Sequence, residues 1–138
     1  MIYLELLPVD YAFYAKVLVL AFLGILFLQS GLDKIFDWKG NLEWLTGHFA
    51  NSPLAGFVPL MLGVITFMEV VAGLFSAAGI FVFIFMGEAW LGFLGVLFSA
   101  ISLVMLFFGQ RMAKDYPGAG GLVPYFIVTV IGLYILGN

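Results

Sequence analysis

The sequence predicts an all-α integral membrane protein, a four-helix transmembrane bundle. The first observation is composition: 64% of the 138 residues are apolar and 9% are charged. A soluble domain averages about 45–50% apolar and about 25% charged residues, and a core of this chain length could not hide so much apolar surface from water. The second observation is that the apolar residues form tracts long enough to span a bilayer, which takes about 20 residues per helix.

The first expected helix covers residues 12–35, with Lys16 and the pair Asp33-Lys34 near its ends. A semi-polar stretch, residues 37–56, follows and is expected to lie in the membrane interface. The apolar tract 57–109 would measure about 80 Å as one helix, which is far too long for a single crossing.

The long tract must therefore contain two helices. The favoured break is Met86-Gly87-Glu88, where a charge beside a glycine can sit at the interface, giving helices at 57–85 and 89–110. A break at Ala77-Ala78-Gly79 is the second choice, because it would leave Glu88 deeper in the membrane. The segment 111–121 is expected to be a polar, glycine-rich loop. The fourth helix is expected at 123–136, with Pro124 in its first turn, where proline is tolerated.

The N-terminus carries Glu5 and Asp10 in place of a basic region, so we expect no cleavable signal and a retained first helix. Four spans bring both ends of the bundle to one side. The first and third loops hold more cations than the other side, which has Lys16. The positive-inside rule then predicts that the first and third loops lie in the cytoplasm and that both termini lie outside. The loop cations are Lys34, Lys39, Arg111 and Lys114.

Small residues at helical spacing mark the faces on which the helices are expected to meet, because membrane helices associate through close approach. They predict a tight bundle without a broad aqueous channel. In chain order they are Ala21, Gly24, Gly31, Gly63, Thr66, Gly73, Ala77, Gly92, Gly95, Ser99, Ser102, Thr129 and Gly132.

Glu69 is the most informative residue, because it falls near mid-membrane on the same face as Thr66 and Gly73. A charge there is costly, so Glu69 is either protonated or paired with a polar group. The expected partners are Gln29 on the first helix and Ser99 or Ser102 on the third. A proton-handling or ligand-orienting carboxyl and a structural hydrogen bond are both open interpretations.

Lys34 shares a face with Gly31, because residues three apart lie on one side of a helix. It could reach inward toward Glu69 or the neighbours of Asp33, or it could extend to the headgroups, as lysines near helix ends commonly do. The second behaviour is the favoured expectation.

The segment from Gly109 to Gly121 combines cations, an acid, an aromatic ring and several glycines. Glycines let backbone N–H groups converge on an anion, and arginine binds planar oxyanions in bidentate fashion. A lipid phosphate, a soluble oxyanion or a carboxylate of a partner would fit, and an ordinary turn is the alternative. The candidate contacts are Gln110, Arg111, Lys114, Asp115 and Tyr116.

Several function classes are excluded. Five Lys/Arg against eight Asp/Glu, a net charge of −3, provide no basic surface for nucleic acid. Without cysteine there is no disulfide, thiol relay or iron–sulfur cluster. A single histidine, His48, cannot supply two axial haem ligands. A metal site needs more ligands than one histidine with scattered carboxylates. His48 is expected in the interfacial segment. The sequence contains no combination of nucleophile, base and acid that would indicate stand-alone catalysis.

Three motifs together resemble the DoxX/DoxD family of small four-span bacterial membrane proteins. They are Gln29-Ser30-Gly31-Leu32-Asp33-Lys34 after Gly24, an intramembrane Glu69 followed by Gly73, and the run Gly109 to Tyr116. The third resembles the DoxD-like branch. The similarity runs from about Tyr11 to Leu136 and implies a four-helix bundle associated with quinone-linked membrane redox enzymes.

Three functions follow as hypotheses. The favoured one is an accessory subunit of a larger quinone-linked membrane complex, without a cofactor of its own. The second is a quinone-binding unit of a thiosulfate:quinone oxidoreductase-type enzyme, with Glu69 or Lys34 on a quinone carbonyl. The third is a small proton-coupled transporter, ranked last because no helix is clearly broken at mid-membrane.

Overall fold

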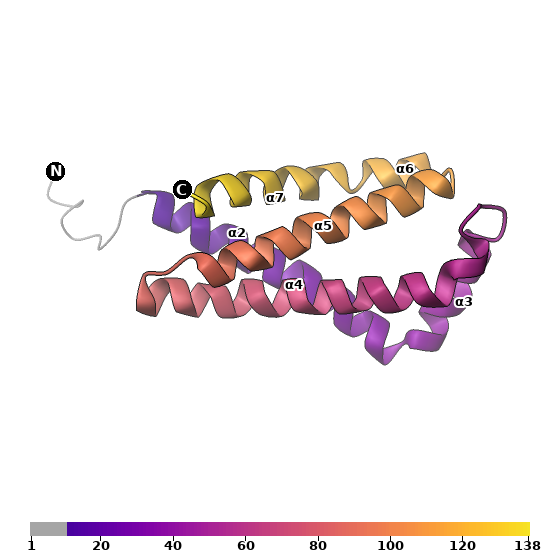
Figure 1. Cartoon of the computed structure of the whole chain (residues 1–138), viewed down its shortest axis with the longest axis horizontal. Helices are drawn as coiled ribbons and strands as arrows, with labels where there is room; N and C mark the ends of the chain where they lie inside the picture. Colours follow the sequence, from indigo (N-terminus) through magenta and orange to yellow (C-terminus); the bar gives the residue numbers. More distant parts are fainter. Residues whose placement is uncertain (1–10) are drawn as a thin grey trace, which may run out of the picture.

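The computed structural model describes residues 11–138 and consists of four long helices with two short ones at one end (Figure 1). Four segments are long and apolar enough to cross a membrane, which confirms the predicted all-α, multi-pass bundle. Glu5 and Asp10, on which the signal-peptide prediction depends, lie outside the described residues. The long helices are α2 (Tyr11–Phe36), α4 (Val58–Met86), α5 (Trp90–Met112) and α7 (Val123–Leu136).

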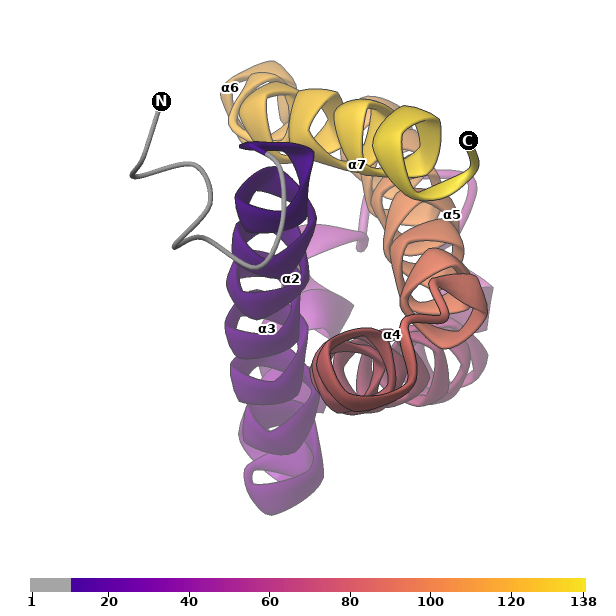
Figure 2. The same ribbon diagram turned by 90° about the vertical axis from the view of Figure 1, so that its left-hand side faces the viewer.

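Helix α4 occupies the central position, packing against α2 on one side and α5 on the other. Helix α7 packs mainly on α5 and reaches α2 as well. Viewed along the bundle, the four long helices surround a common axis, with α2 at one edge (Figure 2). The C-terminus lies at the same end as the start of α2 (Figure 1), as an even number of crossings requires.

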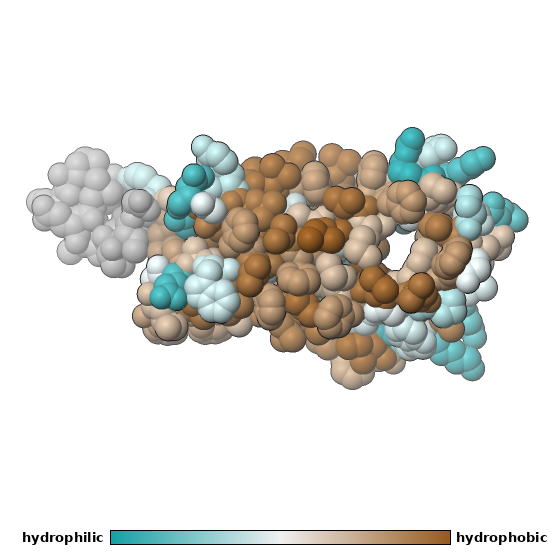
Figure 3. All heavy atoms as spheres, viewed as in Figure 1, coloured by the Kyte–Doolittle hydropathy of each residue, from teal (hydrophilic) through white to brown (hydrophobic). Residues whose placement is uncertain are grey.

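The surface of the bundle is banded. Apolar side chains cover its middle, and hydrophilic ones gather toward the two ends (Figure 3). The same view shows an opening with a largely apolar rim between α4 and α5, near the α3 end. The bundle is therefore open at this end, and the apolar band is the part of the surface that the hydrocarbon core of a bilayer would cover.

The long apolar tract breaks at the favoured position. Gly87 ends α4 in the left-handed conformation, with φ of 70°, and its N–H donates to the Phe83 carbonyl at 3.0 Å. Glycine adopts this conformation without a steric penalty. Glu88 is exposed and accepts a 3.0 Å hydrogen bond from Trp90 Nε1, so the charge sits at the end of the bundle.

Two short helices occupy segments that the sequence analysis left irregular. Helix α3 (Trp38–His48) lies in the expected interfacial stretch, and the 3₁₀ turn η1 (Ala55–Phe57) precedes α4. Helix α6 (Tyr116–Gly120) lies within the segment expected to be a loop, which corrects that prediction. Its cause is local: the Asp115 side chain accepts from the Gly118 N–H, and Pro117 occupies the first turn, where proline is favoured.

Small residues bring α4 close to both neighbours. A Cβ at Gly73 would lie 2.6 Å from the Leu28 backbone nitrogen of α2, and one at Gly95 would lie 2.5 Å from the Ser76 nitrogen. Most of the predicted small-residue positions are buried, whereas Ala21, Gly63 and Ala77 are half-buried. The buried ones are Gly24, Gly31, Thr66, Gly73, Gly92, Gly95, Ser99, Ser102, Thr129 and Gly132.

Candidate functional site

The candidate site is a buried carboxyl group in the contact between α2 and α4. Glu69 is 2% exposed and lies about 16 Å along α4 from Val58 at 1.5 Å per residue. Its side chain meets two polar residues of α2, Ser30 and Lys34. We refer to Ser30, Lys34 and Glu69 as the intramembrane cluster.

The cluster is a ring of short polar contacts. Lys34 Nζ lies 2.8 Å from Glu69 Oε1, an ion-pair contact without the alignment of a hydrogen bond. Ser30 Oγ donates to Glu69 Oε2 at 2.9 Å and accepts from Lys34 Nζ at 2.8 Å. The lysine also approaches the Ser30 carbonyl oxygen at 3.4 Å. The serine hydroxyl thus uses its one proton on the carboxylate and a lone pair on the ammonium.

Helix geometry explains why these residues meet. Ser30 and Lys34 are one helical turn apart and so lie on the same face of α2. Gly31 lies between them and lets α4 approach, since a Cβ there would lie 2.8 Å from Val70 Cγ2. Gly73, one turn beyond Glu69, allows the same close approach from the other helix. The glycines therefore set the separation at which short polar side chains can bridge the two helices.

The two charges of the cluster compensate each other, while Glu69 Oε1 is in ion-pair contact only. An ammonium group has three donors, and three oxygen atoms surround Lys34 Nζ within 3.4 Å. Opposite charges attract strongly where water is excluded, and removing one partner would leave the other buried and uncompensated. The Lys34 side chain is 16% exposed and Ser30 is half-buried, so the more accessible side of the cluster is the one that α2 provides.

The structure corrects the expected partners of Glu69. Gln29 is exposed on the outer side of α2, and its neighbour Ser30 takes the expected role. Ser99 and Ser102 are buried on α5, but their hydroxyls donate to carbonyls of their own helix, Gly95 at 2.8 Å and Phe98 at 2.7 Å. Serines in helices commonly bond back in this way.

The other residues at the end of α2 also differ from expectation. Asp33 is exposed and takes no part in the cluster. Lys34 was expected to extend to the headgroups, and that preference is wrong, because its ammonium turns inward onto Glu69. A nearby opposite charge outweighs the gain from reaching water in this case.

A second polar group lies at the end of the bundle, where α3 meets α5 and α6. His48 Nε2 lies 2.7 Å from Gln110 Oε1 and 3.6 Å from Asp115 Oδ2. The histidine donates in the first contact, because an amide oxygen can only accept. Its ring also stacks on Trp44 at 4.6 Å. We call His48, Gln110 and Asp115 the end cluster.

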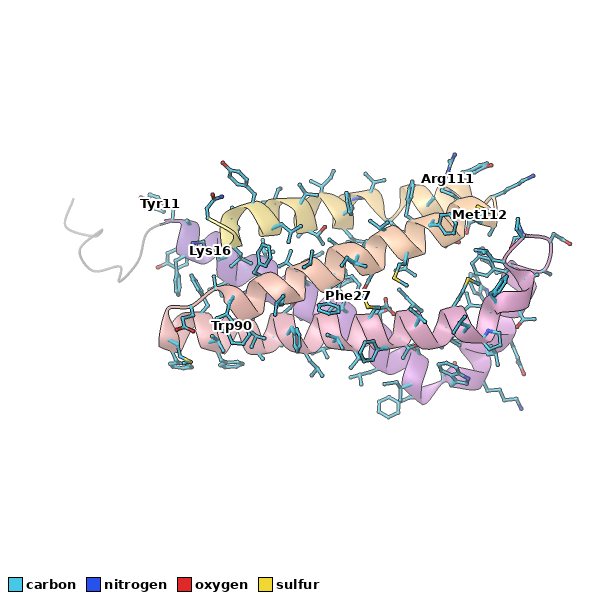
Figure 4. The ribbon with its side chains drawn as sticks, viewed as in Figure 1. Tyr11, Lys16, Phe27, Trp90, Arg111 and Met112 are labelled. Atoms are coloured by element: carbon cyan, nitrogen blue, oxygen red, sulfur yellow. The ribbon has the colours of Figure 1, made fainter. Side chains whose placement is uncertain are left out.

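The end cluster bears on the prediction that the segment from Gly109 to Gly121 binds an anion. Asp115 Oδ1 accepts the Gly118 N–H at 3.0 Å, so the anion that this glycine N–H meets is a carboxylate of the chain itself. The side chain of Arg111 lies over the Tyr116 ring, 4.5 Å from its centroid, and both residues are exposed. Figure 4 shows Arg111 at the α6 end of the bundle.

Lys114 is exposed and adopts a positive φ of 59°. The loop candidates therefore form two groups. The side chains of Gln110 and Asp115 form contacts within the fold, whereas Arg111, Lys114 and Tyr116 form an exposed trio. The sequence analysis placed His48 in the interfacial segment but did not connect it with Gln110, because nothing local signals a contact between residues so far apart in the chain.

The fold and the cluster define a class: a multi-pass α-helical membrane protein with an internally neutralised charge between its first two spans. Within residues 11–138, no group of three or more His, Asp or Glu side chains could hold a metal ion. The chain matches none of the protein-family models, curated proteins or solved structures with which it was compared.

Proposed function

We propose that the protein is an accessory subunit of a larger membrane complex, of the DoxX/DoxD kind that the sequence resembles and linked to quinone-dependent redox chemistry. The observation that carries this proposal is the mutual neutralisation of the charges in the intramembrane cluster. Lys34 and Glu69 neutralise each other, and Ser30 hydrogen-bonds to both, so these two charges of the membrane region serve helix packing. A chain whose ionisable groups are committed in this way contributes structure to a larger assembly.

The proposed location is the bacterial inner membrane, with periplasmic termini. The support comes from the positions of the cations. Lys39 on α3 and Arg111 and Lys114 near α6 lie at the end opposite the C-terminus (Figure 1). Cations in short loops favour the cytoplasmic side. On this orientation the exposed trio Arg111, Lys114 and Tyr116 faces the cytoplasm, where it is the proposed contact for the partner complex.

Quinone binding is the second candidate, favoured by the 16% exposure of the Lys34 side chain. The weakest contact of its ammonium, 3.4 Å to the Ser30 carbonyl, is the one that a quinone carbonyl could replace. The apolar opening between α4 and α5 lies at the same end of the bundle as the C-terminal end of α2, near α3 (Figure 3). An isoprenoid tail would suit such an apolar rim.

The test is purification of the tagged chain from native membranes in a mild detergent, followed by mass spectrometry of proteins and of extracted quinones. The accessory-subunit proposal expects one larger membrane protein in constant ratio. Recovery of the chain alone with bound quinone would instead support the second candidate. Recovery of the chain alone without quinone would contradict both.

Matched variants sharpen this test. Arg111→Gln removes an exposed cation from the proposed contact, whereas Lys39→Gln removes one from α3 with the same charge change. We expect the first to reduce recovery of the partner severalfold and the second to leave it unchanged. For quinone, Glu69→Ala should abolish binding while Ser99→Ala retains it, with folding of each variant checked by helical content.

A further inference from the structure

Gln29 is a polar residue on the outer side of a membrane helix. Its side chain is exposed, and it has no hydrogen-bond partner among the described residues. The hydroxyl-bearing Ser and Thr residues of the other long helices behave differently, because all of them are buried in the bundle. They are Thr66, Ser76, Ser99, Ser102 and Thr129.

Gln29 lies within the apolar part of α2. Lys16 and Asp33 mark the charged ends of this part, which is about 25 Å long at 1.5 Å per residue, and Gln29 lies about 6 Å inside Asp33. Its neighbour Ser30 contacts Glu69, so the amide lies at the depth of the intramembrane cluster but is turned by about 100° around the helix from Ser30. An unpaired amide in hydrocarbon is unfavourable, which indicates a partner outside the chain.

The residues around Gln29 form a continuous face. Starting at Leu18, exposed residues recur at alternating spacings of four and three, which is the spacing of a helix that packs along another helix. The side chains that face α4 occupy the other side of α2, with Leu20, Gly24, Phe27 and Gly31 buried. The exposed set, which we call the outer face of α2, comprises Leu18, Phe22, Ile25, Gln29, Leu32 and Phe36.

We propose that the outer face of α2 is a dimerisation surface that binds the same face of a second copy, with the two Gln29 amides hydrogen-bonded to each other. Copies inserted in the same orientation are parallel, so a two-fold axis along the membrane normal brings each outer-face residue opposite its own counterpart. In this geometry, a polar residue on the outer face must be of a type that can hydrogen-bond to an identical residue. A carboxylate or an ammonium would meet a like charge, whereas an amide carries both donors and an acceptor.

The position of Gln29 within the face fits this occupant. The residue falls among large apolar side chains that pack against one another, and a single polar residue inside such a seam fixes register and oligomeric state. This side of α2 lies at the edge of the bundle (Figure 2). Its Phe22 ring contacts α7, with its centroid 6.1 Å from that of the Tyr125 ring. Pairing centred on Gln29 therefore requires no rearrangement of α4 or α5.

The absence of cysteine from the chain allows a direct test with single introduced cysteines in native membranes. Ile25→Cys lies on the outer face beside an intact Gln29, and Val64→Cys on α4 is the exposed control. Under mild oxidation we expect Ile25→Cys to form disulfide-linked dimers and Val64→Cys to remain monomeric. Dimers formed equally at both positions, or capture of a different protein by Ile25→Cys, would overturn the proposal.

The amide itself is tested by measuring dimer affinity in lipid vesicles, from energy transfer between labelled copies of the purified chain at increasing lipid dilution. Gln29→Leu should weaken the dimer about tenfold, the order expected for hydrogen bonds between membrane helices. Ile101→Asn, which places an amide on the exposed side of α5, should not restore it in the Gln29→Leu chain. An unchanged affinity in Gln29→Leu would refute the pairing. The purified chain is sufficient for this measurement, so its outcome is independent of the accessory-subunit proposal.

Discussion

Lys34 of α2 and Glu69 of α4 form an ion pair, with Nζ and Oε1 2.8 Å apart, where the first two membrane helices pack against each other. The Ser30 hydroxyl hydrogen-bonds to both partners, donating to the carboxylate and accepting from the ammonium. The pair therefore sets the register between the first two spans. It also removes the net charge that would oppose burial of this face in lipid.

Close approach at Gly73 should be required for the pair to form. A Cβ at this position would lie 2.6 Å from the Leu28 backbone nitrogen, and backbone cannot yield as a side chain can. We expect Gly73→Ala to lower the free energy of unfolding by about 1–3 kcal/mol, as overpacking typically does. Denaturant titration in detergent micelles measures this change.

Gly63→Ala is the matched control on the same helix, because the nearest atom to its Cβ is Trp38 Cη2 at 3.9 Å. This is ordinary van der Waals contact, so the free energy of unfolding should change little. If both variants lowered the free energy of unfolding equally, the contact between α2 and α4 would not be what makes Gly73→Ala unfavourable. That result would contradict the close packing described for these two helices.

The hydrogen bond between His48 and Gln110 should hold α3 against α5. His48→Ala removes the 2.7 Å contact and the stacking on Trp44, at a cost of about 1–2 kcal/mol. Faster amide hydrogen exchange in residues 38–48 is the expected result, with exchange in the middle of α5 unchanged. Thr46→Ala serves as control, since its hydroxyl bonds only to the Leu42 carbonyl of α3. Identical exchange in His48→Ala and the unaltered chain would count against the link.

The proposed orientation predicts which end of the bundle faces the periplasm. A single cysteine at Asn138 should react with a membrane-impermeant maleimide in intact cells, because the C-terminus lies at the end with fewer loop cations. A cysteine at Lys114 should react only after permeabilisation. The reverse pattern of labelling would place the termini in the cytoplasm.

Hydropathy, together with the residues that mark helix ends, predicts the long helices of this fold well. The break at Gly87 and the start of α7 near Pro124 agree with the sequence analysis, because a charge, a glycine and a proline mark them. Helices α3 and α6 were not predicted. The polar composition of α3 lacks a membrane signal, and α6 depends on Asp115 capping the Gly118 N–H, a contact with only weak sequence evidence.

The sequence predicts the burial of Glu69 but not the partner of its carboxylate, and the reason is helix geometry. Burial of Glu69 follows from its place on the small-residue face of α4, so its need for a partner is visible in the sequence. The identity of that partner depends on the rotation of α2 about its axis. One position along a helix turns a side chain by about 100°, which separates the expected Gln29 from the observed Ser30.

The most direct test of the central feature is a double-mutant cycle between Lys34 and Glu69. Lys34→Met should leave a buried carboxylate unpaired and lower the free energy of unfolding by about 3 kcal/mol. Adding Glu69→Gln should recover most of that loss, giving a coupling energy of about 2 kcal/mol. The matched cycle of Lys16→Met with Glu69→Gln should show no coupling. Additive effects for Lys34 and Glu69 would contradict an ion pair between the first two membrane helices.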